Sequence, residues 1–93
     1  MINLKIQFFN ILAAYTGRKN LDFSVPEGTA LTDAIVLMAA RFSPVFQEIV
    51  IPQGVPSRHL RIFLNGKPVG KTEFKTPLRD GDEIMLFPAV SGG

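Results

Sequence analysis

One long stretch of the chain has the apolar spacing of an α-helix, while the segments around it have the spacing of β-strands. Its apolar residues recur three or four positions apart, at Leu31, Ala34, Ile35, Met38, Ala39 and Phe42. This is the stripe of an amphipathic helix. Thr29 or Thr32 is expected to cap its first turn, Asp33 suits the positive end of the helix dipole, and Arg41 suits the negative end. Such a stripe must be buried, so it favours a fold in which one helix lies on a sheet.

Four segments alternate apolar and polar residues with the period of a half-buried strand, at residues 2–9, 21–25, 59–65 and 83–87. The first two are predicted to pair as a hairpin whose long connection, residues 10–19, turns at Gly17. Asn65 and Gly66 signal a tight turn before a brief edge strand at 67–69. Residues 51–58 are predicted to be loop and 70–77 a polar linker. Ser43 before Pro44 starts one short helical turn over 44–50.

This order of elements predicts one α+β domain with a mixed sheet and one main helix packed on one face. A length of 93 residues, 46% hydrophobic and 19% charged, suits a single packed domain. The net charge is only +2 and the basic residues are scattered, so no nucleic-acid partner is expected. Polar residues interrupt the first nine positions, and neither a signal peptide nor a membrane span is predicted. We therefore expect a cytoplasmic protein that does not bind a membrane.

The residue types also limit the chemistry available to the chain. It has no cysteine and one histidine, His59, which is more typical of an exposed strand or loop residue than of a catalytic base. Asp80, Asp82 and Glu83 cluster beside Gly81, where they are best interpreted as turn formers. No metal site is expected, and the chain is predicted to catalyse nothing alone.

The face of the sheet opposite the helix is predicted to be unusually apolar. If the helix covers Ile2, Leu4, Ile6, Leu60, Ile62, Leu64, Ile84 and Leu86, the alternation places Phe9, Phe63, Met85 and Phe87 on the other face. A contiguous apolar cluster suggests a protein contact surface. The alternative is that these side chains pack under the long loops, 10–18 or 51–58, as a second core. Both remain open for Phe9 and Phe63, and the contact surface is favoured for Phe87 because it adjoins Pro88.

The last sixteen residues form a turn, a strand and a tail. Gly81 can take a positive φ in the turn at residues 79–82, a strand follows at 83–87, and Pro88 disfavours its continuation. Residues 89–93 carry no charged side chain and end in Gly92 and Gly93. Fully extended, residues 88–93 reach about 20 Å, enough to enter a deep, narrow site. We expect a domain over residues 1–88 and a flexible tail over 89–93.

The segment RDGDEIMLFPAVSGG resembles the C-terminus of the ubiquitin-like sulfur carriers, the family of the molybdopterin synthase small subunit (MoaD) and the thiamine sulfur carrier (ThiS). The FP and the PAVSGG ending look most like the molybdopterin synthase small subunit. The resemblance implies the β-grasp (ubiquitin-like) fold, with the first and last long strands side by side. It also implies that an E1-like enzyme uses ATP to adenylate the Gly93 carboxylate, which a sulfur donor then converts into a thiocarboxylate. No cofactor would be bound by the chain itself.

By the same resemblance, the tail enters a sulfur-accepting synthase, such as the molybdopterin synthase large subunit. The partner-binding residues expected for this role are Phe63, Met85, Phe87, Pro88, Val90, Ser91 and Gly92. The extra length between Ser43 and Arg58 leaves carriers for cysteine or thiamine synthesis open. A modifier joined to lysines of other proteins would use the same activated Gly93. A passive interaction domain, with Gly-Gly incidental, is the remaining alternative.

Overall fold

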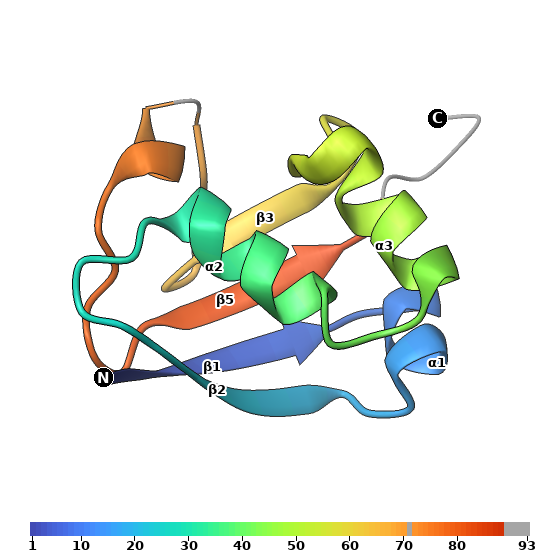
Figure 1. Ribbon diagram of the computed structural model, residues 1–93, viewed down its shortest axis with the longest axis horizontal. Helices are drawn as coiled ribbons and strands as arrows, with labels where there is room; N and C mark the ends of the chain where they lie inside the picture. The colour runs from blue at the N-terminus through green and yellow to red at the C-terminus, as the bar shows by residue number, and fades with distance from the viewer. Residues whose placement is uncertain (71, 89–93) are drawn as a thin grey trace.

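The computed structural model describes residues 1–70 and 72–88. Within them, strands β1 to β5 form one mixed sheet in the order β2-β1-β5-β3-β4, and the helices cover one face of it (Figure 1). The strands are β1 (Ile2–Phe8), β2 (Asn20–Val25), β3 (Arg61–Leu64), β4 (Lys67–Pro68) and β5 (Glu83–Phe87). The α-helices are α1 (Ile11–Thr16), α2 (Leu31–Ala39) and α3 (Pro44–Val50), and the 3-10 turns are η1 (Pro52–Gly54) and η2 (Glu73–Lys75). None of the helices in this part of the chain is long and apolar enough to cross a membrane.

The central pair of the sheet joins the two ends of the chain. β1 pairs antiparallel with β2 and parallel with β5, and β5 pairs antiparallel with β3. The predicted hairpin of the first two strands and the adjacency of the first and last long strands are both confirmed. Strand β3 is shorter than predicted, because His59 and Leu60 lie in the turn before it.

The buried face of the sheet follows the predicted alternation. Along β1, every second side chain is buried, and the same holds for β2. The core combines these side chains with those of α2, and its members include Leu4, Ile6, Phe23, Val25, Leu31, Ile35, Met38, Ile62, Ile84 and Leu86. Leu60 and Leu64, which were predicted to be covered by the helix, are only partly buried but pack against this core. The prediction of the covered face is therefore confirmed, with looser packing at its β3 edge.

The connection at residues 10–19, predicted to be irregular, contains helix α1. Asn10 enters it with a φ of 54°, and Gly17 ends it in the left-handed conformation with a φ of 75°. Leu12 is fully buried, whereas Ile11 and Tyr15 are exposed. Six residues are too few for a helix to be stable alone, so burial of Leu12 against the core is what stabilises this turn of helix.

Helix α2 begins where predicted, but its first turn is satisfied differently. Its N-cap is Ala30, which has no side chain to accept a hydrogen bond, so the expected cap by Thr29 or Thr32 is wrong. The amide of Leu31 donates instead to the carbonyl of Thr76 at 3.3 Å. Asp33 lies in the first turn as predicted, whereas the last turn holds no basic residue because the helix ends at Ala39, before Arg41.

Helix α3 confirms the predicted start at Ser43. The Ser43 hydroxyl oxygen accepts a hydrogen bond from the Phe46 amide at 3.2 Å, and Pro44 occupies the first turn. Phe46 is fully buried and meets Phe8 edge to face, with ring centroids 5.8 Å apart. Phe42, past the end of α2, packs against both rings. The α3 helix is therefore anchored on the end of β1 through aromatic contacts.

Candidate functional site

The candidate site is the open face of the sheet where β5 ends. Residues that are paired across strands point to the same face, and the register pairs Phe63 with Met85 and Arg61 with Phe87. Phe9 follows β1, and its amide donates to the carbonyl of Leu86 at 3.1 Å. The last described residue, Pro88, stands directly after this row. The surface therefore adjoins the point where the predicted tail departs.

Three aromatic rings pack against one another on this surface. The rings of Phe9 and Phe87 are stacked, with centroids 4.1 Å apart and an angle of 11° between their planes. Phe63 meets Phe87 edge to face at 5.4 Å and 72°. We call Phe9, Phe63, Met85 and Phe87 the aromatic face. All four are half-buried, and none is among the residues that form or pack against the described core. They cover one another, which favours the contact-surface interpretation over a second core.

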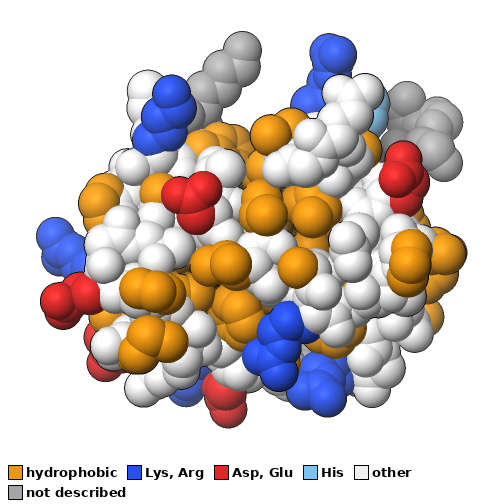
Figure 2. Space-filling model, viewed as in Figure 1, with side chains coloured by type: hydrophobic (Ala, Val, Ile, Leu, Met, Phe, Trp, Pro, Cys, Tyr) orange, Lys and Arg blue, Asp and Glu red, His pale blue; other side chains and the backbone are white. Residues whose placement is uncertain are grey.

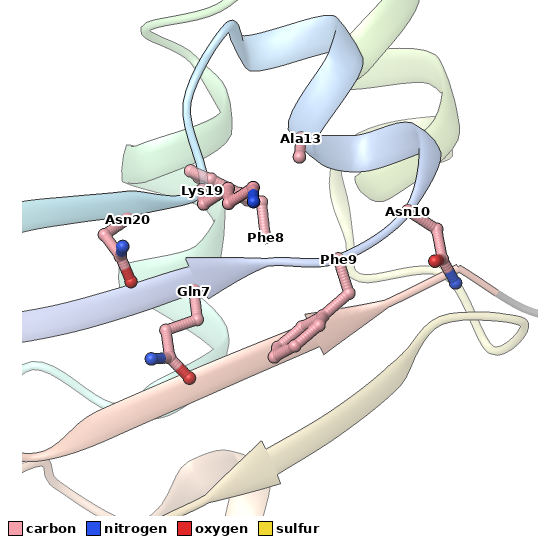
Figure 3. A pocket seen from close by; sticks show the side chains of 7 residues that line it. All are labelled: Gln7, Phe8, Phe9, Asn10, Ala13, Lys19 and Asn20. Carbon is pink, nitrogen blue, oxygen red and sulfur yellow. The ribbon is translucent and has the colours of Figure 1, made fainter.

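Two grooves flank the stacked pair. The first, about 480 Å³, is lined by Gln7, Phe8, Phe9, Asn10, Ala13, Lys19 and Asn20, and we call it the Lys19 groove. In Figure 3, Phe9 lies between Lys19 on one side and Asn10 on the other, while Ala13 points down from α1. The second, about 410 Å³, is lined by Asn10, Arg61, Phe63, Phe87 and Pro88, and we call it the Arg61 groove. Asn10 lines both, so the grooves meet at the turn into α1.

The charged part of the open face lies farther from the end of β5. Lys5, in the central strand β1, is in register with Asp22 on one side and Glu83 on the other. The next row toward Pro88 holds the amide side chains of Asn20 and Gln7 on β2 and β1, in register with Met85 and Phe63 of the aromatic face. The opposite, helical face carries charged side chains of both signs interspersed with apolar ones (Figure 2). The open face is therefore divided into an apolar end near Pro88 and a charged end.

The turn that precedes β5 fixes where the strand begins. Gly81 has a φ of 87° and its amide donates to the carbonyl of Asn3 at 2.7 Å. The Asp80 carboxylate accepts from the Asn3 amide at 2.6 Å, and the Asp82 carboxylate accepts from the Arg79 amide at 2.8 Å. Asp80 and Asp82 act as turn formers, as predicted, whereas Glu83, also predicted to be one, is the first residue of β5. The turn ties the start of β5 to the start of β1, and so sets the register that brings Phe87 beside Phe9.

The histidine and the acidic side chains of the described residues form no metal site. His59 is exposed in the turn before β3, and residues 1–70 and 72–88 contain no group of three or more His, Cys, Asp or Glu side chains placed to hold a metal ion. Among the predicted site residues, Phe63, Met85 and Phe87 come together on the aromatic face, and Pro88 follows Phe87 directly beside it. Val90, Ser91, Gly92 and Gly93 lie outside the described residues, as does the whole predicted tail, so the boundary between residues 88 and 89 stays a prediction.

Two residues of this surface, Lys19 and Asn10, had no signal in the sequence, and a third, Arg61, had only part of one. Lys19 and Asn10 belong to the connection whose helix was not predicted, and Asn10 reaches both grooves only because α1 starts there. Arg61 alternates with Phe63 in β3, so the strand period already placed it on the open face. What the sequence did not indicate is that it stands opposite Phe87.

Known proteins share both the sequence pattern and the fold. Residues 6–93 match the model of the ThiS family. Small archaeal modifier protein 3 of Haloferax volcanii is 26% identical over 93 residues, covering 99% of this chain and 100% of that protein. The solution structure of the Haloferax volcanii HVO 2177 protein has a TM-score of 0.84 and 26% identity, over 99% of this chain and 87% of the other. Small archaeal modifier protein 1 of Methanosarcina acetivorans has a TM-score of 0.81 and 24% identity, over 100% and 98%.

The shared architecture is the β-grasp fold, which confirms the fold implied by the sequence resemblance. A match over residues 6–93 includes the Gly-Gly ending as well as the domain. The chain therefore belongs to the ThiS family of ubiquitin-like proteins, a group of small carriers and modifiers.

Proposed function

We propose that the protein is a sulfur carrier whose reactive group is the α-carboxylate of Gly93. The observation that carries this proposal is the family match over residues 6–93, because it includes Ser91, Gly92 and Gly93 as well as the folded domain. The described side chains present no catalytic constellation, so the chemistry is assigned to partner enzymes. The chain then acts as a co-substrate and not as an enzyme.

The proposed cycle has two steps on the same carbonyl carbon. In the first, a carboxylate oxygen of Gly93 attacks the α-phosphorus of ATP in an E1-like adenylating enzyme, which forms the acyl adenylate and releases pyrophosphate. In the second, a sulfide-level donor attacks the carbonyl, the bond to AMP breaks, and a thiocarboxylate and a proton result. The partner consumes the ATP, and we propose that the cycle runs in the cytoplasm.

The fold supports this role by presenting the tail from a rigid base. β5 is held between β1 and β3, and Pro88 ends its ladder because proline has no amide hydrogen to donate. Glycine at 92 and 93 lets backbone approach a nucleotide closely, since no Cβ intervenes. We propose that Val90, Ser91 and Gly92 are held in the partner's channel. Pro88 and the aromatic face, with Phe87 and Phe63 in contact, form the docking surface beside it.

As the sulfur acceptor we propose the large subunit of molybdopterin synthase. The support for this choice is the FP and PAVSGG ending, by which the sequence resembles the small subunit of that enzyme. Synthases of cysteine or thiamine synthesis are the alternatives, and delivery assays with each purified acceptor would separate the three. Product formed with only the cysteine or the thiamine enzyme would reassign the pathway and leave the carrier role in place.

One observation favours a second function, conjugation to other proteins. The relative that is 26% identical over 93 residues is itself a small archaeal modifier protein. The same Gly93 adenylate would then be attacked by a lysine amine, forming an isopeptide bond and releasing AMP. A ladder of conjugates in extracts, lost when Gly92 and Gly93 are deleted, would support this function.

The decisive experiment is the intact mass of the protein isolated under mild, thiol-free conditions, with fragmentation to locate any change. We expect a mass increase equal to replacing one oxygen by sulfur, at Gly93. The matched control lacks Gly92 and Gly93 and should show no such change, with the same melting temperature. An unmodified Gly93 after incubation with the adenylating enzyme, ATP and sulfide would contradict sulfur transfer. Full biological activity of the truncated control would indicate a passive interaction domain instead.

A further inference from the structure

The grooves beside the aromatic face each carry one cation and no acid. Lys19 lines the first groove and Arg61 the second, and no Asp or Glu is among the described residues that line either. Both side chains are exposed. The acids of the open face, Asp22 and Glu83, flank Lys5 in the charged row, where they already face a cation. The apolar end of the sheet is therefore bordered by two positive charges on opposite sides.

The spacing of the two cations follows from the sheet. Lys19 precedes β2 and its carbonyl accepts from the Phe8 amide at 2.8 Å, so it lies beside the end of β1. Arg61 is in β3, opposite Phe87. The order β2-β1-β5-β3 puts three strand spacings between them, which is about 14 Å of backbone. The stacked rings of Phe9 and Phe87 occupy the two strands in between.

We infer that the partner docking on this face presents an apolar surface bordered by two carboxylates, one for Lys19 and one for Arg61, whose backbones lie about 14 Å apart. This inference rests on the proposed function, because it describes the docking surface of the adenylating enzyme. An apolar centre with charged edges is the usual layout of a transient protein interface. The apolar centre supplies the affinity, and the edge charges set orientation and association rate.

The two cations also disfavour a second copy of this chain as the partner that binds this face. Two copies meeting through the same face would each bring Lys19 and Arg61 to the border of the contact. Neither copy would supply a carboxylate within the grooves that hold Lys19 and Arg61, because Asp22 and Glu83 flank Lys5 and Glu83 adjoins the aromatic face only at Met85, its end farthest from Pro88. A different protein with acidic edges satisfies both cations.

Orientation has a direct consequence for the proposed reaction. The two cations stand on different sides of Pro88, the residue from which the tail departs, and the Arg61 groove includes Pro88 itself. Pairing both cations with carboxylates fixes the rotation of the domain about the axis of contact. A fixed rotation aims the tail at one channel of the enzyme. Lys19 and Arg61 are therefore positioning residues for Gly93.

The test uses the full chain and the purified adenylating enzyme of the same organism. Lys19→Glu and Arg61→Glu are each expected to weaken binding roughly three- to tenfold, and the double variant roughly ten- to a hundredfold. The differences should shrink at about 0.5 M salt, because exposed charges are screened within a few ångströms there. The control, Lys75→Glu, reverses a cation on η2, which contacts α2 on the other face, and should stay within about twofold of the wild type.

A chemical readout locates the carboxylates directly. A carbodiimide joins an amine to a carboxylate that touches it, so a cross-link from Lys19 to an acidic residue of the enzyme is expected, and Lys75 should form none. This inference would be overturned, while the proposed function stands, if the wild type is bound and adenylated but the three variants bind equally well. The three variants are Lys19→Glu, Arg61→Glu and Lys75→Glu. No binding or adenylation of the wild type would overturn both. The inference would also be contradicted if the wild type forms concentration-dependent dimers that the enzyme dissociates equally well with and without the substitutions at Lys19 and Arg61.

Discussion

Replacing Phe87 by alanine separates docking from folding. Most of the ring is buried, so its removal forfeits roughly two thirds or more of the 1.5–3 kcal/mol that full burial of a phenylalanine contributes, which is about 1–2.5 kcal/mol. It also removes the contacts with Phe9 and Phe63, and at this partly exposed site each is worth about 0.5 kcal/mol. The expected loss in the free energy of unfolding is therefore about 2–3.5 kcal/mol. A domain with about 5 kcal/mol of stability would remain about 90% or more folded.

The loss of binding should be measurable while the domain stays folded. A central aromatic side chain of an interface typically costs about 2 kcal/mol or more when truncated, which corresponds to about a 30-fold weaker affinity. We would measure the affinity of Phe87→Ala for the adenylating enzyme by titration calorimetry and its stability by urea unfolding. The control is Ile84→Val, in the same strand but facing the core and fully buried. It should lose about 0.5–1.5 kcal/mol of stability and no affinity.

Two results would refute this reasoning. Wild-type affinity of Phe87→Ala would show that the aromatic face is not the docking surface. Loss of the folded circular dichroism spectrum of Phe87→Ala at 25 °C would instead mean that the ring belongs to a second core. A parallel loss of affinity in Ile84→Val would show that stability, and not the lost ring, controls binding.

Three further predictions concern the scaffold. Ser43→Ala should lower the free energy of unfolding by about 1 kcal/mol, because the hydroxyl caps α3; urea midpoints test this, and an unchanged midpoint would show that solvent replaces the cap. Gly81→Ala should cost about 1–2 kcal/mol in the same assay, because alanine is strained at a φ of 87° even though nothing lies near its Cβ. The pKa of Glu73 should lie below its usual 4.5, because the Thr72 hydroxyl and then the Gly70 amide donate to its carboxylate. A carboxylate with a lowered pKa contributes stability that is fully present above its pKa in the unfolded state and is lost as pH falls through its pKa in the folded state. An NMR titration midpoint for Glu73 at or above 4.5 would contradict these contacts.

The strands and the main helix could be predicted because each is long enough to repeat its period. Alternation in β1, β2 and β5 marks a face within one segment, and the five-residue strand at 83–87 ends at Pro88 as predicted. The same alternation placed Phe9, Phe63, Met85 and Phe87 on one face. It did not decide whether they touch one another or a loop. The stacking of Phe9 on Phe87 depends on two strands from opposite ends of the chain.

Helix α1 and the start of α2 could not be predicted, because distant residues stabilise them. Six residues give too short a pattern to recognise, and α1 exists because Leu12 is buried. At α2, the prediction assumed a local side-chain cap. The carbonyl of Thr76 accepts the hydrogen bond from the Leu31 amide instead, next to the isolated bridge between Ala30 and Pro77. Local signals cannot show a partner that lies some 45 positions away along the chain.

The sequence by itself determined the strand and helix faces, the turn at Gly81, the end of β5 at Pro88 and the family to which the Gly-Gly ending belongs. These are set by local period, by backbone geometry of glycine and proline, and by a contiguous motif. Only the tertiary structure decided that Lys19 and Arg61 border the aromatic face. Their separation is fixed by strand order, and strand order depends on burial of the whole core, a property that no single segment carries.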